Sequence, residues 1–126
     1  ILYTGIERPD VMAVLTDDGL RSARAQLIAL GPTSRLYWNA ALGEITSRAQ
    51  VVLLRLADVR VKRENLAIMV TAAIVQREGL YPLAALKDAI VLGQRPEIAR
   101  ENLAAVDVGA ALEPQMEADE ATDEHR

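Results

Sequence analysis

Few side chains in this 126-residue sequence are of the types that carry chemistry in proteins. The sequence contains no Cys, and its one His, His125, is the next-to-last residue of an acidic stretch. Without cysteine the chain cannot supply a thiolate nucleophile or the thiolate ligands of an iron–sulfur cluster. His125 has no predicted rigid neighbour that would orient it as a base or a metal ligand. We therefore predict no catalytic residue and no metal site in this chain.

One basic group stands out before the acidic end. Arg60, Lys62 and Arg63 lie just ahead of an apolar stretch that begins at Glu64. The group can be a solvated turn, or it can bind a phosphate-bearing ligand or an acidic partner through charge-assisted hydrogen bonds. Both interpretations stay open, and Arg60 and Lys62 are the candidate cofactor-binding residues.

An acidic turn, Thr16-Asp17-Asp18, follows the first apolar run. Because open α/β sheets place ligands at the carboxyl ends of their strands, this turn is a candidate metal or phosphate-adjacent site. The stronger interpretation is structural: Asp17 or Asp18 can cap the free amides of a following helix, which stabilises the helix by about 1 kcal/mol.

Two asparagines lie near the starts of predicted apolar helices. The amides of Asn65 and Asn102 need hydrogen-bond partners if they are buried. The simplest interpretation is that they bond to backbone groups at the helix ends. Gly109 follows Asn102 by seven residues on the same helical face, which predicts a close approach of another backbone there.

The elements that position these residues are indicated by hydrophobic periodicity. A continuous apolar run at residues 11–15 is typical of a strand buried on both faces, and residues 35–38 and 50–56 read as two further strands. Between the first two strands we expect a single helix that ends at Gly31-Pro32, with one apolar face formed by Leu20, Ala23, Leu27 and Leu30.

From Glu64 onward the pattern predicts three helices, with stops or starts at Gly79, Pro82, Gly93 and Pro96. The first is apolar on nearly every side, so we expect other protein to surround it. The second has Leu83, Leu86 and Ile90 on one face, and the third has Ile98, Asn102, Ala105, Gly109 and Leu112. The fold class is therefore α/β: a layered sheet with flanking helices and an all-helical C-terminal half, built as one domain over residues 1–112.

Charge divides the chain unevenly. Residues 113–126 carry six acidic side chains against Arg126, a net of −5 within a total of −4, which leaves the rest at +1. We expect 113–126 to be an acidic disordered tail. The near-neutral remainder has no stripe of Lys and Arg to neutralise phosphates, so a nucleic-acid partner is excluded.

No apolar run approaches the roughly 18–20 residues of a membrane-spanning helix. The start at Ile1 shows no signal segment and suggests a piece of a longer sequence. The absence of cysteine fits a reducing compartment, so we expect a cytoplasmic protein.

Three helical segments carry a family resemblance: ENLAIMVTAAI at 64–74, LAALKDAI at 83–90 and ENLAAVDVG at 101–109. They resemble, in order and spacing, the end of the gamma subunit or domain of the 2-oxoacid:acceptor (ferredoxin) oxidoreductases. Residues 8–15, RPDVMAVL, resemble that family's middle strand, and the match spans most of residues 6–112. Thr71 or Ala72 stands where the family usually has Gly, Arg55 stands where its strand ends in Pro or an apolar residue, and its Gly-rich N-terminal segment would precede Ile1.

The resemblance implies a non-redox subunit in a complex that converts a 2-oxo acid to an acyl-CoA, CO2 and reduced acceptor. Thiamine diphosphate and iron–sulfur clusters would reside on partner subunits, and this chain would help to wall the coenzyme A site. These residues do not distinguish the family members that act on pyruvate, 2-oxoglutarate, 2-ketoisovalerate, indolepyruvate or phenylglyoxylate. Two alternatives stay open: a stand-alone small-molecule-binding α/β domain with the Asp17-Asp18 turn as its site, and a purely structural interaction module.

Overall fold

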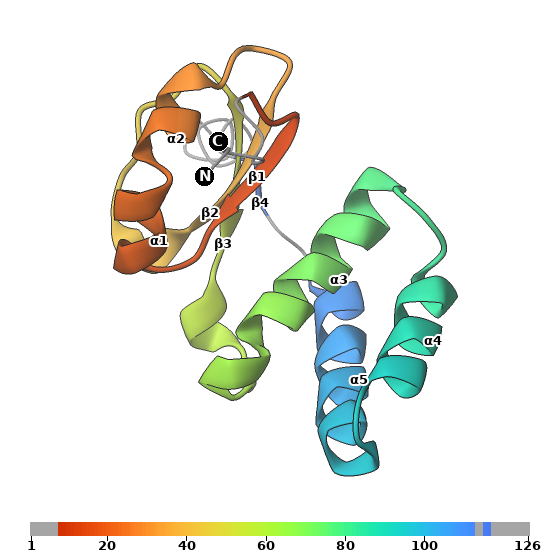
Figure 1. Cartoon of the computed structure of the whole chain (residues 1–126). Coiled ribbons are helices and arrows are strands. Elements are labelled where there is room, and N and C mark those ends of the chain that lie inside the picture. Colours follow the sequence, from red (N-terminus) through yellow and green to blue (C-terminus); the bar gives the residue numbers. More distant parts are fainter. Residues whose placement is uncertain (1–7, 113–114, 117–126) are drawn as a thin grey trace, which may run out of the picture. The chain divides into compact units, whose positions relative to one another are not determined.

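The computed structural model describes residues 8–112 and 115–116, which fall into two units (Figure 1). The first, called the sheet unit, comprises the described residues up to Asp58 together with 115–116. The second, called the helical unit, comprises residues 59–112. The sequence predicts a single domain over 1–112, whereas the contacts group into these two units.

The sheet unit contains the strands β1 (Val11–Val14), β2 (Arg35–Asn39), β3 (Gln50–Leu54) and β4 (Gln115–Met116) in that order across the sheet. The first three strands are parallel to one another, and β4 pairs with β3 in the antiparallel sense. Helices flank this sheet, and every element within residues 59–112 is a helix, so the predicted α/β class is confirmed.

The acidic end was expected to be a tail from residue 113. This is wrong for β4, because Gln115 and Met116 pair with Leu53 and Val52 of β3. Backbone hydrogen bonding to a strand edge needs no apolar pattern, which is why charge composition alone missed it. The rest of the predicted tail, with His125, lies outside the described residues.

One face of the sheet is covered by α1 (Asp17–Ser22), α2 (Arg24–Ala29) and the β2–β3 connection. Its core is the buried set Val14, Leu30, Leu36, Trp38, Ala49 and Val51, against which Leu20, Leu27, Leu42 and Ile45 pack. The prediction of a single helix is wrong. Ala23 has φ −108° and ψ 16°, outside the helical region, and separates α1 from α2.

The prediction that the first strand is buried on both faces is also wrong, because Ala13 is exposed and Val11 and Met12 are half-buried. The reason is position: β1 is an edge strand with β2 as its only described neighbour. The third strand was expected over residues 50–56 and spans 50–54; it is covered on both faces, with Val51 buried on one and Val52 and Leu54 on the other.

The connection between β2 and β3 contains the short 3₁₀-helix η1 (Ala40–Leu42). It is held in place from β2. The indole nitrogen of Trp38 donates to the carbonyl oxygen of Gly43 at 2.8 Å, and Gly43 takes φ 97°, a left-handed conformation that favours glycine. The Asn39 amide donates to the Leu15 carbonyl at 2.9 Å and its oxygen accepts from the Ala41 amide. A second 3₁₀-helix, η2 (Leu56–Asp58), closes the unit.

The helical unit begins with η3 (Arg63–Asn65) and continues as α3 (Leu66–Glu78), α4 (Leu83–Gly93) and α5 (Pro96–Ala111). The predicted stops and starts are confirmed: Gly79 ends α3 in a left-handed conformation at φ 64°, and Pro96 lies in the first turn of α5. The buried cluster Ala72, Ile90, Ala99 and Val106 joins the three helices, with Leu83 and Leu86 packed against it.

The predicted face of α5 is partly wrong. Ile98 is 48% exposed, and the buried positions are Ala99, Ala105, Val106 and Gly109. The close approach predicted at Gly109 is confirmed, because a Cβ there would lie 2.1 Å from the carbonyl oxygen of Met69 on α3.

Other protein is not needed to bury most of the large apolar surface of α3, contrary to the expectation from its sequence. Met69, Val70, Ala72, Ala73 and Val75 are already buried within this chain. None of the helices in residues 8–112 is long and apolar enough to cross a membrane.

Candidate functional site

The predicted residues Arg60 and Lys62 line one pocket of about 200 Å³, which lies entirely within the helical unit. The segment before η3 supplies these two cations together with Val61. Helix α5 supplies the facing wall. Arg63, the third member of the basic cluster, is exposed and does not line the pocket.

The wall from α5 follows helical spacing. Glu101, Ala104, Ala105 and Val108 are three, four and seven residues apart along one face of the helix. Three of the four side chains are small or aliphatic, so the wall is apolar except at Glu101. The pocket therefore pairs an apolar surface with a charged edge.

The charged edge is an ion pair between the two elements. Lys62 Nζ donates to Glu101 Oε1 at 2.9 Å, with the two side chains 63% and 48% exposed. The hydrogen bond from Lys62, and then its charge, hold the pKa of Glu101 below its usual range. The same hydrogen bond and the charge of Glu101 raise the pKa of Lys62. Because the pair is exposed, it adds little net stability.

Arg60 differs from Lys62 in having no ion-pair partner among the described residues. Its guanidinium is exposed and carries an uncompensated positive charge at the pocket. A guanidinium can form two parallel hydrogen bonds to a carboxylate or phosphate. The site can therefore hold one anionic group at Arg60 while an apolar part of the same ligand contacts the α5 wall.

Both asparagines have hydrogen-bond partners. Asn65 is buried at the pocket, and its side-chain hydrogen bond to Glu101 also lowers the pKa of that carboxyl. Helix capping is the wrong interpretation for Asn65, because its side chain makes no cap hydrogen bond to α3. The Asn102 amide nitrogen donates to Gln94 Oε1 at 2.7 Å and joins the end of α4 to α5.

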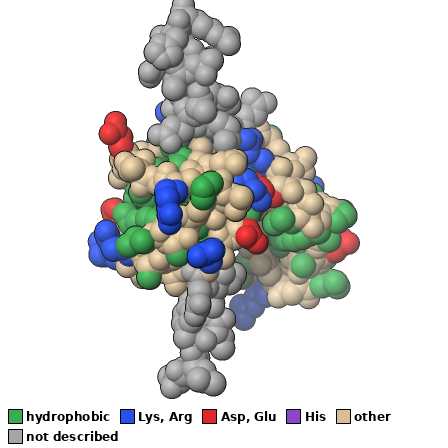
Figure 2. All heavy atoms as spheres, turned by 90° about the horizontal axis from the view of Figure 1, so that it is seen from above, with side chains coloured by type: hydrophobic (Ala, Val, Ile, Leu, Met, Phe, Trp, Pro, Cys, Tyr) green, Lys and Arg blue, Asp and Glu red, His purple; other side chains and the backbone are tan. Residues whose placement is uncertain are grey.

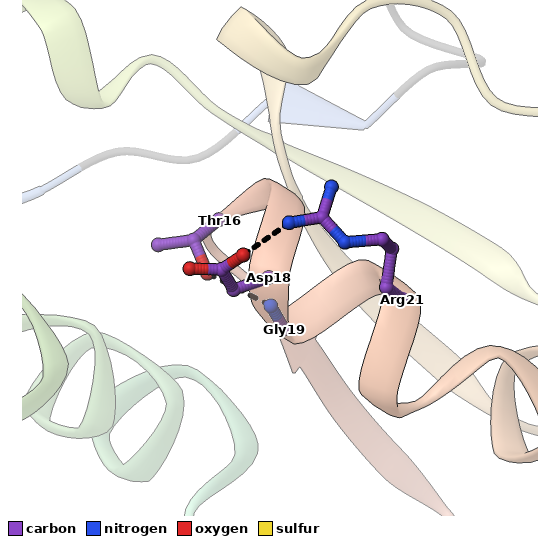
Figure 3. A network of polar contacts seen from close by, with 4 residues as sticks. All are labelled: Thr16, Asp18, Gly19 and Arg21. Carbon is purple, nitrogen blue, oxygen red and sulfur yellow. Dashed lines mark hydrogen bonds and ion pairs between the residues drawn. The ribbon is translucent and has the colours of Figure 1, made fainter.

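The acidic turn is a helix start (Figure 3). Thr16, and not Asp17 or Asp18 as predicted, caps α1: its Oγ1 accepts from the Gly19 amide at 3.0 Å. Threonine has an extended backbone at this position, so its hydroxyl reaches the third amide of the turn. Asp18 pairs with Arg21 one turn on.

Asp17 and Asp18 lie in the first turn of α1, where their negative charges stabilise the positive end of the helix dipole. In the part of the chain that the structure describes, no three His, Cys, Asp or Glu side chains gather as metal ligands would. Helix capping and the helix dipole therefore account for Thr16, Asp17 and Asp18 without a ligand.

Sequence reasoning missed Glu101 as a site residue. Helical spacing places Glu101, Ala105 and Val108 on one stripe of α5, but no local signal indicates that this stripe faces Lys62, 39 residues earlier. No family model matches the chain, and no curated protein sequence matches it significantly.

Proposed function

We propose that this chain is a gamma-type subunit or domain of a 2-oxoacid:acceptor oxidoreductase complex. In such a complex a 2-oxo acid, coenzyme A and an oxidised acceptor give an acyl-CoA, CO2 and the reduced acceptor. This chain contributes to assembly and to the coenzyme A site and carries no redox centre. The iron–sulfur clusters belong to partner chains, since this sequence has no cysteine to ligate iron, and the family resemblance assigns thiamine diphosphate to partner chains as well.

One observation carries the coenzyme A part: Arg60 and Lys62 meet at a pocket that also has an apolar wall. Coenzyme A combines phosphate groups with a long, uncharged arm, and this combination needs both kinds of surface. Its thiol supplies the acyl acceptor of the reaction when it is bound. Arg60 is the residue that would hold a phosphate group, because its charge is uncompensated.

The fit of coenzyme A is partial. A pocket of about 200 Å³ is smaller than the roughly 300–1,000 Å³ of sites that enclose a drug-sized ligand, so it receives one end of coenzyme A only. Lys62 is engaged by Glu101, and a phosphate would have to share Lys62 with that carboxylate. The remainder of the coenzyme would contact other surfaces, which fits a site shared with partner chains.

The assembly part is supported by the outer face of α4. Before the terminal Gly93, its exposed residues fall on one continuous arc of the helix: Ala84, Ala85, Asp88, Ala89, Val91 and Leu92. Asp88 is the one charged residue among these six, and Leu92 is 87% exposed. Figure 2 shows exposed hydrophobic side chains on the right-hand part of the face, among other places. Exposed apolar surface of this kind marks protein interaction sites.

Coenzyme A binding is tested on the complex purified with its partner chains. We expect Arg60→Glu to raise the dissociation constant of coenzyme A, measured by calorimetry, by about tenfold or more, because one charge-assisted contact is replaced by repulsion. Arg77→Glu makes the same charge change at an exposed position of α3 and should leave the constant unchanged. Equal dissociation constants for the two variants would mean that coenzyme A does not bind in this pocket.

Assembly is tested by co-expression with the partner chains and size-exclusion chromatography. Leu92→Glu should release this chain from the complex, whereas Gln76→Glu, an exposed change on α3, should not. If Leu92→Glu disrupts the complex while Arg60→Glu leaves coenzyme A binding intact, the chain is a structural interaction module. If the chain neither associates with thiamine diphosphate and iron–sulfur subunits nor affects them, the oxidoreductase proposal is wrong.

A further inference from the structure

A second pocket, of about 450 Å³, lies within the sheet unit between α2 and the loop at residues 45–48. Its volume falls within the range of sites for small organic ligands, roughly 300–1,000 Å³. It belongs to the other unit from the Arg60 pocket and does not depend on the function proposed above.

The pocket has an apolar interior and one apolar residue that nothing covers. Leu27, Leu30 and Ile45 belong to or pack against the core of the sheet unit and also line the pocket. Ile28 lines it too and is 72% exposed, the one large hydrophobic residue so exposed among the described residues of this unit. A ligand with an apolar body would remove Ile28 from water, which is favourable in proportion to the area covered.

Two arginines line this pocket, one from each of the two elements that form it. Arg24, from α2, lies one helical turn before Ile28 and so shares its face, and Arg48 comes from the loop. Neither arginine has an ion pair or hydrogen bond among the described residues, and none of the residues lining the pocket is acidic. Two like charges at one small pocket repel each other, and an anion placed between them would be attracted by both.

The pocket is built into the fold. The Trp38–Gly43 hydrogen bond ties the chain just ahead of the loop to β2. Near its end, the Ser47 hydroxyl oxygen accepts from the Ala49 amide at 3.1 Å, and Ile45 is anchored in the core. Because the loop is held near both ends, a ligand would have to order little backbone, and the ordering cost falls mainly on the exposed side chains of Arg24 and Arg48.

We propose that this pocket binds a small amphipathic anion. The anionic head, a carboxylate or phosphate, is held by the guanidinium groups of Arg24 and Arg48, and a short apolar body contacts Ile28 and Ile45. Recognition needs both halves of the ligand: the two arginines select the charge, and the apolar lining selects the chain attached to it.

The test is a titration of the full-length, ¹⁵N-labelled chain with octanoate, followed by amide NMR shifts. We expect saturable shifts in residues 24–30 and 45–48, with a dissociation constant on the order of 1 mM for a ligand of this size. The uncharged analogue octanol and inorganic phosphate each supply one half of the recognition and should bind at least about tenfold more weakly. Octyl phosphate carries a phosphate in place of the carboxylate on the same alkyl chain, so comparing its binding with that of octanoate shows which head group the pocket prefers.

Variants separate this pocket from general attraction to a basic surface. Arg24→Gln with Arg48→Gln should weaken octanoate binding by about tenfold or more, whereas the control pair Arg77→Gln with Arg100→Gln, exposed arginines of the helical unit, should not. Ile28→Ser should weaken octanoate as well, which keeps the test valid if the double variant folds poorly. The proposal is overturned if octanoate shows no saturable shifts, if octanol or phosphate binds equally well, or if the control pair weakens binding as much.

Discussion

Replacing Gly109 by alanine tests the packing that brings α5 against α3. The added Cβ would lie 2.1 Å from the carbonyl oxygen of Met69 and 3.1 Å from the Cβ of Ala72. The nearest atom belongs to the backbone of a helix, so it cannot turn aside as the end of a long side chain could. The two helices would have to separate by an amount on the order of an ångström, which loosens the packing on both sides of the contact.

Two effects of opposite sign set the magnitude. Alanine is a better helix former than glycine in a helix interior by about 1 kcal/mol, so a loosely packed α5 would gain stability from the change. Overpacking a tight contact costs about 1–3 kcal/mol, and a rigid backbone obstacle favours the upper end. We therefore expect Gly109→Ala to lower the free energy of unfolding of the helical unit by about 2 kcal/mol.

The assay is urea unfolding of the full chain followed by far-ultraviolet circular dichroism. The single tryptophan, Trp38, lies in the sheet unit, so its fluorescence reports on the other unit. With a slope of about 2 kcal/mol per molar urea, the expected loss moves the midpoint down by about 1 M. Gly93→Ala is the matched control: a Cβ at this helix-end residue meets nothing within 4 Å, so it should be neutral or stabilising. A Gly109→Ala protein as stable as wild type would refute the close α3–α5 contact.

Three further changes have expected outcomes. Thr16→Ala removes the N-cap hydrogen bond of α1 and should lower the unfolding free energy by about 1 kcal/mol in urea titrations, whereas an unchanged midpoint would mean that the cap is not formed in solution. Lys62→Met removes the main cause of the lowered pKa of Glu101, so the NMR titration midpoint of that carboxyl should rise toward 4.5. Lys87→Met breaks the ion pair between Lys87 of α4 and Asp107 of α5 and should leave that midpoint in place. Leu36→Ala deletes a fully buried side chain and should cost about 2–5 kcal/mol, and a cost below about 1 kcal/mol would contradict its place in the core.

The amino-acid sequence alone predicts the types of most elements, because local patterns control them. Continuous apolar runs mark β2 and β3, and Gly79 and Pro96 mark helix boundaries through backbone geometry that neighbours do not alter. The sequence fails where a residue carries no such restriction. The break at Ala23 involves neither Gly nor Pro, and the burial of β1 depends on its place at the sheet edge, which a run of apolar letters does not encode.

The candidate sites divide in the same way. Local charge density was enough to select Arg60 and Lys62, and helical spacing was enough to expect a close approach at Gly109. Only the tertiary structure sets Glu101 against Lys62 and closes the pocket, because that contact joins residues 39 apart and exists only while α5 packs beside the segment that begins α3. Likewise, Arg24 and Arg48 lie in different connections of the sheet unit, and only the packing of α2 beside the loop at 45–48 brings both to one pocket.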